Sequence, residues 1–116
     1  MEIDKDSIRR AETRKLNKIA KAVPEGKAGV AKSLIRELVF MACTLEELRA
    51  DVDEKGAVEL FKNGKQEMFR ESPALKSYST LIQRYSLLYR QLCELLPKDE
   101  AKGAEDELQA FLSQTL

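Results

Sequence analysis

Apolar residues between Pro73 and Pro97 recur at alternating steps of three and four, which is the spacing of one helix face. Ser72 precedes Pro73, and a serine N-cap followed by proline is a common helix start. Pro97 ends the helix, because the residue before a proline is driven out of the α region. The apolar face is wide, so we expect a long partner helix, other subunits, or both to cover it. Its members are Leu75, Tyr78, Leu81, Ile82, Tyr85, Leu88, Tyr89, Leu92, Leu95 and Leu96.

A second apolar stripe predicts a long helix that begins near residues 26–29 and ends near Lys55. Its members are Val30, Leu34, Leu38, Met41, Leu45, Leu48 and Val52. Residues 44–47 have the form of a capping box and could begin a new helix. The stripe passes through them without losing phase, so we expect one continuous helix that ends before Gly56.

Residues 1–23 predict a shorter first helix with an irregular apolar side and a basic opposite side. Asp4 or Asp6 can cap its start. The residues of the basic side are Arg9, Arg10, Arg14, Lys15, Lys18 and Lys21. Proline and glycine at residues 23–26 then predict a turn before the second helix.

Residues 57–71 break the helical pattern. Asn63-Gly64 favours a two-residue hairpin turn, because type I′ turns need positive φ at both central residues. We therefore expect a β-hairpin with arms at residues 57–62 and 65–70. A helix over residues 58–70 is the competing interpretation.

A turn centred on Asn63-Gly64 also sets the register of the hairpin. It places Leu60 opposite Glu67 and Val58 opposite Phe69, so neither face is cleanly apolar. A lone hairpin is marginal in water. We expect it to lean on the long helices or on another subunit.

Beyond Pro97 the sequence predicts a polar linker at residues 98–103 and a short acidic helix over residues 104–113. Taken together, residues 1–98 form a single helical domain, and residues 99–116 form the linker and the short helix. The predicted fold class is mainly α. It has a long antiparallel helix pair with a small β-hairpin between the helices, plus N-terminal and short C-terminal helices.

The charges of this 116-residue chain cancel, with 20 basic and 20 acidic residues. Zero net charge argues against a chain that coats nucleic acid along its whole surface. The charge is nevertheless segregated: residues 1–32 and 61–98 are positive in excess, and residues 33–60 and 99–116 are negative. The chain lacks a secretory leader and any long apolar run, which predicts an intracellular soluble protein.

Candidate chemistry is sparse. Without histidine, the usual triads and the commonest general base are excluded, and no glycine-rich phosphate loop is present. Cys43 and Cys93 lie in or beside apolar stripes, so we expect two buried thiols. The antiparallel pairing separates them too far for a disulfide. We therefore predict no catalytic residue, no metal site and no cofactor.

Two groups of residues are candidates for binding surfaces. The basic side of the first helix could neutralise phosphates without reading sequence, although a solvated helix face has the same composition. Tyr78, Tyr85 and Tyr89 could stack on bases, but their helical spacing favours core or interface packing. With Leu92, we assign these tyrosines to an oligomer interface.

Four runs of this sequence together resemble the small terminase subunits of tailed bacteriophages, in particular short prophage-type members. The runs are Phe40–Arg49, Gly56–Gln66, Arg70–Tyr78 and Leu95-Leu96-Pro97. The resemblance spans about residues 15–98. It lies mainly in the order of a long helix, a glycine-containing hairpin, a Ser-Pro-Ala helix start and an aromatic-rich helix.

The resemblance implies a non-enzymatic DNA-packaging protein in the cytoplasm of a bacterial host. Such subunits assemble into rings, bind double-stranded viral DNA and regulate the large terminase subunit, which carries the ATPase and nuclease. A separate N-terminal helix-turn-helix domain, which many members carry, has no counterpart here. The DNA-contacting surface is therefore the basic first helix, the ring lumen, or absent, and charge assigns it to the basic first helix. The rival hypothesis is a helical adaptor or dimerisation module without a nucleic-acid role, in which acidic segments pair with that helix.

Overall fold

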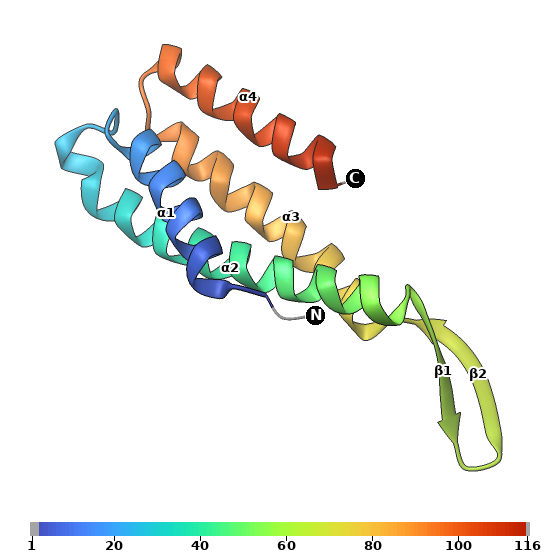
Figure 1. Ribbon diagram of the computed structural model, residues 1–116. Helices are drawn as coiled ribbons and strands as arrows, with labels where there is room; N and C mark the ends of the chain where they lie inside the picture. Colours follow the sequence, from blue (N-terminus) through green and yellow to red (C-terminus); the bar gives the residue numbers. More distant parts are fainter. Residues whose placement is uncertain (1–2, 116) are drawn as a thin grey trace.

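Two long antiparallel helices form the centre of the molecule, α2 (Ala28–Lys55) and α3 (Pro73–Glu94). The computed structural model describes residues 3–115, so residues 1–2 and 116 of the predicted segments lie outside the described residues. As Figure 1 shows, α1 (Lys5–Ala20) packs along α2 and α4 (Lys98–Thr115) along α3. The molecule measures 61 × 25 × 23 Å. The mainly α-helical fold predicted from the sequence is confirmed.

The helix ends follow the capping residues of the sequence. The Asp4 carboxylate accepts a hydrogen bond from the Ser7 N–H at 3.1 Å and caps α1. The Ser72 hydroxyl accepts one from the Leu75 N–H at 3.4 Å, ahead of proline at the first position of α3. Gly56 ends α2 with φ of 91°, a left-handed value that glycine adopts without strain. α2 runs through residues 44–47 without a break, as predicted.

Each of the four helices contributes to one core. Leu16 of α1, Leu38 of α2, Leu92 of α3 and Leu108 of α4 are all at most 1% exposed and belong to the same cluster. Burying a leucine side chain contributes about 1.5–3 kcal/mol. The four helices are therefore held together by one continuous aliphatic interior.

The C-terminal linker predicted at residues 98–103 is wrong, because α4 is already helical from Lys98. α3 stops at Glu94, and the Ala101 N–H donates to the Pro97 carbonyl oxygen at 2.9 Å, in the first turn of α4. Proline is tolerated at a helix start, where N–H groups lack helical partners. Acidic residues in the first turn also suit that end of the helix. Pro97 therefore separates two helices.

The hairpin consists of β1 (Val58–Asn63) and β2 (Gln66–Glu71), paired antiparallel. This confirms the hairpin and excludes the competing helix. The predicted register is wrong: Leu60 lies opposite Phe69. The turn is centred on Gly64-Lys65, with φ of +63° at Gly64 and no positive φ at any described non-glycine residue. Positive φ at the first central residue alone is the type II′ pattern. Asn63 stays in the strand.

The hairpin projects from the end of the helix pair instead of lying along it (Figure 1), which excludes the first expected support, the long helices; packing against another subunit stays a prediction. Val58, Leu60 and Phe69 share one face, and Phe69 is 75% exposed. On the other face the Arg70 guanidinium contacts the Glu59 carboxylate at 2.6 Å and lies 4.3 Å from the Phe61 ring centre. The hairpin thus presents apolar side chains to its surroundings.

Candidate nucleic-acid interface

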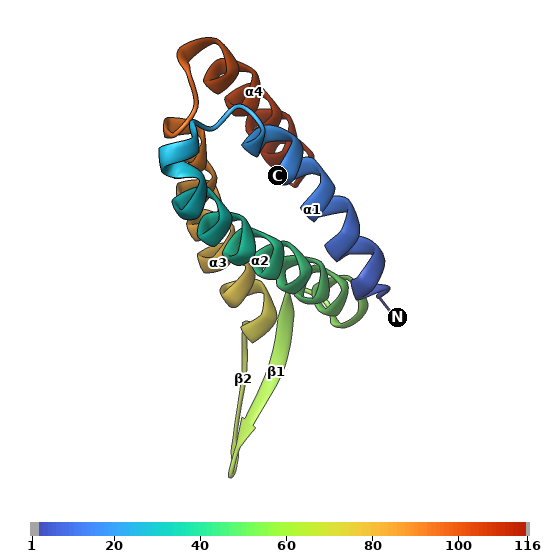
Figure 2. The same ribbon diagram turned by 90° about the vertical axis from the view of Figure 1, so that its left-hand side faces the viewer.

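α1 carries the basic residues that the sequence assigns to DNA, and it places them on three different sides of the helix. Its apolar side, with fully buried Leu16, faces the core and fixes the rotation of the helix. Figure 2 shows α1 and α4 beside each other above the α2–α3 pair. The basic residues point toward α2, toward the core near α4, or outward.

Arg9 lies on the side of α1 that faces α2. Its guanidinium contacts the Asp6 carboxylate at 2.7 Å within the first turn of the helix. It also lines a groove between α1 and α2. Arg9 is therefore partly neutralised and set apart from the outward basic residues.

Lys15 is half-buried and directed toward α3 and α4. Its amino group lies 3.1 Å from the Glu12 carboxylate and 3.5 Å from the Tyr85 hydroxyl. It also lies 5.6 Å from the ring centre of Tyr89 and 5.2 Å from that of Phe111. A cation with these partners is partly neutralised and directed away from the exposed side of α1. The structure thus separates Lys15 from the DNA-binding set.

The remaining four residues, Arg10, Arg14, Lys18 and Lys21, lie on the solvent-exposed side of the helix, and two of them, Arg14 and Lys18, also line a groove toward α4. All are exposed, and none forms an ion pair with a described residue. Their spacing of four, four and three residues places them in one line along the helix. At a rise of 1.5 Å per residue the line is about 16 Å long. We call these four residues the outer basic line.

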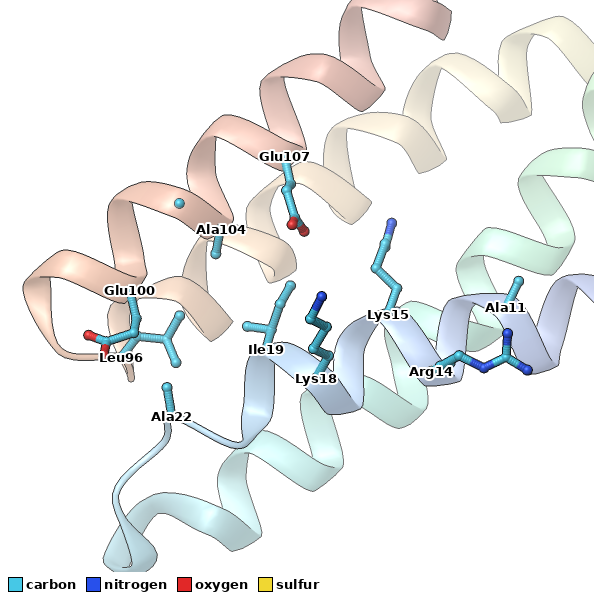
Figure 3. Close-up of a pocket in the computed structure, with 11 residues that line it drawn as sticks. Ala11, Arg14, Lys15, Lys18, Ile19, Ala22, Leu96, Glu100, Ala104 and Glu107 are labelled. Atoms are coloured by element: carbon cyan, nitrogen blue, oxygen red, sulfur yellow. The ribbon is translucent and has the colours of Figure 1, made fainter.

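A groove of about 500 Å³ separates α1 from α4 beside this line. Arg14, Lys15 and Lys18 line it from α1, and Glu100 and Glu107 line it from α4. Figure 3 shows Lys15 and Lys18 pointing toward α4, while Glu107 points back toward α1. No ion pair spans the groove among the described residues. The acidic helix therefore lies near the basic line but does not neutralise it by contact.

The oligomer interface predicted from the aromatic stripe is wrong for three of its four residues. Tyr85, Tyr89 and Leu92 are 0%, 1% and 0% exposed, because α1 and α4 cover this side of α3. Tyr78 is half-buried and packs against the same core. The sequence does not predict this, because an apolar stripe does not show whether the helices that bury it belong to the same chain or to another subunit.

A buried polar cluster joins α1 to α3. The Tyr85 hydroxyl donates to the Glu12 carboxylate at 2.5 Å. Burial, and secondly the Glu12 charge, raise the pKa of Tyr85. Burial likewise raises the pKa of Tyr89, whose hydroxyl is buried and has no hydrogen-bond partner. Both phenols therefore stay neutral at any physiological pH. Nothing in the sequence pattern singled out Glu12.

The two cysteines are buried and free, as expected from their place in the apolar stripes. Burial raises the pKa of the Cys93 thiol to about 11 and also raises that of Cys43. Thiols with raised pKa are poor nucleophiles at neutral pH. Within residues 3–115 no cluster of three possible metal ligands occurs. None of the helices in that range has the length and apolar character needed to cross a bilayer.

No family model, no curated protein and no solved structure matches this chain.

Proposed function

We propose that this chain is a DNA-contacting assembly protein and that α1 contacts the phosphate backbone through the outer basic line. The observation that supports this is the set of four exposed cations without ion-pair partners, Arg10, Arg14, Lys18 and Lys21. A line of about 16 Å spans several phosphates of one strand, which follow one another about every 3.4 Å along the axis of the duplex. Contacts of this kind give affinity and orientation without reading the base sequence.

The biological role that we propose follows from the sequence resemblance described above. In this proposal the chain is a small terminase subunit of a phage or prophage in the bacterial cytoplasm. It binds double-stranded viral DNA and regulates the large terminase subunit, without catalysing a reaction itself. The exposed apolar face of the hairpin, formed by Val58, Leu60 and Phe69, supports the oligomeric part of the proposal. Exposed apolar patches commonly mark protein contacts.

The test is a salt titration of binding to a duplex. Neutralising Arg10, Arg14 and Lys18 to glutamine should weaken binding and lower the slope of log affinity against log salt. Each lost phosphate contact removes about 0.9 from that slope, so the triple variant should lose nearly 3. Fluorescence anisotropy with a labelled duplex measures both quantities.

The matched control neutralises three exposed residues outside α1. Lys65 lies in the turn between β1 and β2, and Lys76 and Arg90 lie on α3. This control changes the net charge by the same amount and should leave the slope near that of the wild type. Equal losses in the two variants would show that binding depends on total charge and not on α1. Failure of the wild type to bind the duplex would contradict the proposed function itself.

A second candidate function is a helical adaptor without a nucleic-acid role. Its supporting observation is the ion pair of 3.0 Å between Lys5 of α1 and Glu47 of α2, which joins the basic helix to an acidic segment as that rival requires. The pair is exposed, and such pairs contribute less than about 1 kcal/mol. The adaptor predicts a dimer that does not bind DNA, so the same titration separates the two functions.

A further inference from the structure

The α1–α2 groove lies on the side of α1 that faces away from α4 and takes no part in the proposed DNA contact. Its volume is about 700 Å³. Ile35 and Val39 form part of its floor, and Phe40 stands at its edge. Phe40 is 66% exposed, unlike its buried neighbour Ile35. An apolar floor with an exposed aromatic ring at its edge is typical of a surface that receives another apolar side chain.

The charged residues that line this groove in the described chain are all basic: Arg9, Lys32 and Arg36. Arg9 already contacts Asp6 at 2.7 Å. Lys32 and Arg36 are exposed, lie one helical turn apart on α2 and form no ion pair with a described residue. The groove therefore has an apolar floor and an unbalanced positive rim.

The shape and chemistry of the groove select its occupant. α1 and α2 run antiparallel, so their outer sides form a trough into which a third helix can pack by ridges and grooves. A nucleic-acid duplex presents phosphates and sugars, which would leave Ile35 and Val39 against polar groups. A helix with leucines on one side and carboxylates on the flanks can pack its leucines on the apolar floor and pair its carboxylates with the basic rim.

A second copy of this chain does not supply such a helix. The acidic helix α4 buries its own apolar side, including Ala104 and Leu108, in the core that it shares with α3. We propose that the α1–α2 groove binds an acidic amphipathic helix of a different protein. Phe40 contacts the apolar side of that helix, and Lys32 and Arg36 pair with its flanking carboxylates. This inference does not depend on the proposed DNA contact.

The probe is a synthetic 18-residue helical peptide with leucines at positions i, i+3, i+4 and i+7 and glutamates on the flanks. A second peptide keeps the leucines and replaces each glutamate by lysine. Titration of the full chain, followed by fluorescence anisotropy, should give at least tenfold tighter binding of the acidic peptide. Amide shifts in an NMR titration should concentrate on the groove residues of α1 and α2.

Two variants test the residues. Phe40→Ala and the double change Lys32→Glu with Arg36→Glu should each weaken binding of the acidic peptide at least tenfold. Their controls are Leu87→Ala, which removes an apolar side chain of similar exposure on α3, and Lys76→Glu with Arg90→Glu. Both controls should leave the affinity within twofold. Because all these residues are exposed, circular dichroism should show unchanged helix content.

Three results would overturn the inference. They are absence of binding, equal binding of the acidic and basic peptides, and equal losses in the groove variants and their controls. If Phe40→Ala weakens duplex binding while peptide binding is absent, the groove belongs to the nucleic-acid surface instead. The DNA titration of the outer basic line can succeed or fail independently of each of these results.

Discussion

Glu12 joins α1 to α3 through a partly buried hydrogen bond to the Tyr85 hydroxyl. Its side chain is only 12% exposed, and its carboxylate is held by the Tyr85 hydroxyl and by the Lys15 amino group. A carboxylate enclosed to this degree needs such partners, because losing one leaves a poorly solvated charge. The same contacts keep Lys15 turned inward. Glu12 thus partly neutralises Lys15, one of the six basic residues assigned to the first helix.

Two tyrosines one turn apart allow a matched test of this cluster. Tyr85→Phe removes the hydrogen bond to Glu12 and should lower the free energy of unfolding by about 1–3 kcal/mol. Tyr89→Phe removes a buried hydroxyl that has no partner, so it should leave stability unchanged or raise it by about 1 kcal/mol. Urea denaturation at neutral pH, followed by circular dichroism, measures both changes.

Each tyrosine variant is the control for the other, because both lose one oxygen atom from almost fully buried rings. Equal destabilisation of the two variants would contradict the role assigned to the hydrogen bond with Glu12. Tyr85→Phe should also release Lys15 partly, since the amino group then keeps only Glu12 as a polar partner.

At the level of secondary-structure elements, the turn of the hairpin depends on one glycine. Gly64 has φ of +63°, which a β-branched residue adopts only at a cost of about 1–2 kcal/mol. Gly64→Thr should therefore abolish strand pairing in a hairpin that is only marginally stable. Asn63→Thr should preserve it, because Asn63 is a strand residue opposite Gln66. NMR contacts between Leu60 and Phe69 report the pairing.

With a type I′ turn on Asn63-Gly64, both variants would lose strand pairing, since Asn63 would then need positive φ as well as Gly64. Loss of strand pairing in Asn63→Thr, or contacts between Val58 and Phe69 in place of those between Leu60 and Phe69 in the wild type, would contradict the register described above. Helix content should not change in either variant, because the hairpin projects from the helices.

The helices were predictable where local chemistry decides their limits. Ser72-Pro73 and Gly56 mark helix ends through groups within a few residues of them, and the structure places both as the sequence indicates. The start of α4 was missed because residues 98–103 have no apolar periodicity and derive their helical state from docking of Leu108 on the core. The predicted hairpin register is wrong because Gly64 fits two turns: the second central position of a type I′ turn on Asn63-Gly64, or the first central position of a type II′ turn on Gly64-Lys65.

The sequence predicts which residues of α1 are basic, but not which of them lie together on an exposed surface without ion-pair partners. The spacing of the outer basic line is visible in the sequence. By contrast, the contacts that separate Arg9 and Lys15 from this line are not visible in the sequence. Arg9 pairs with Asp6, and Lys15 contacts Glu12 and aromatic rings of α3 and α4. The groove beside Phe40 was likewise invisible, because its shape depends on the distance between α1 and α2. Contacts between distant segments determine the candidate site.

For the whole molecule, the main expectation is that the hairpin face mediates assembly. Leu60→Ser with Phe69→Ser should lower the solution mass, measured by light scattering after size exclusion, while helix content stays constant. The wild type should have a mass well above that of a dimer. The physical reason is that these cross-strand neighbours are 46% and 75% exposed and gain from being covered.

Leu87→Ser is the control, because Leu87 is 57% exposed but lies on α3 and not on the hairpin. It should leave the mass unchanged. A wild-type chain that is monomeric, with and without duplex DNA, would exclude the ring and leave the hairpin face without the proposed role.

The base of the hairpin is closed by a hydrogen bond of 2.8 Å from the Ser72 N–H to the Ala57 carbonyl oxygen. The chain therefore leaves the helix pair and returns to it at nearly the same point. Everything between these two residues can be lengthened, shortened or exchanged without moving α2 or α3. In evolutionary terms we expect the hairpin to behave as a replaceable module, whose tip can diversify with whatever it contacts while the core constrains the helical body.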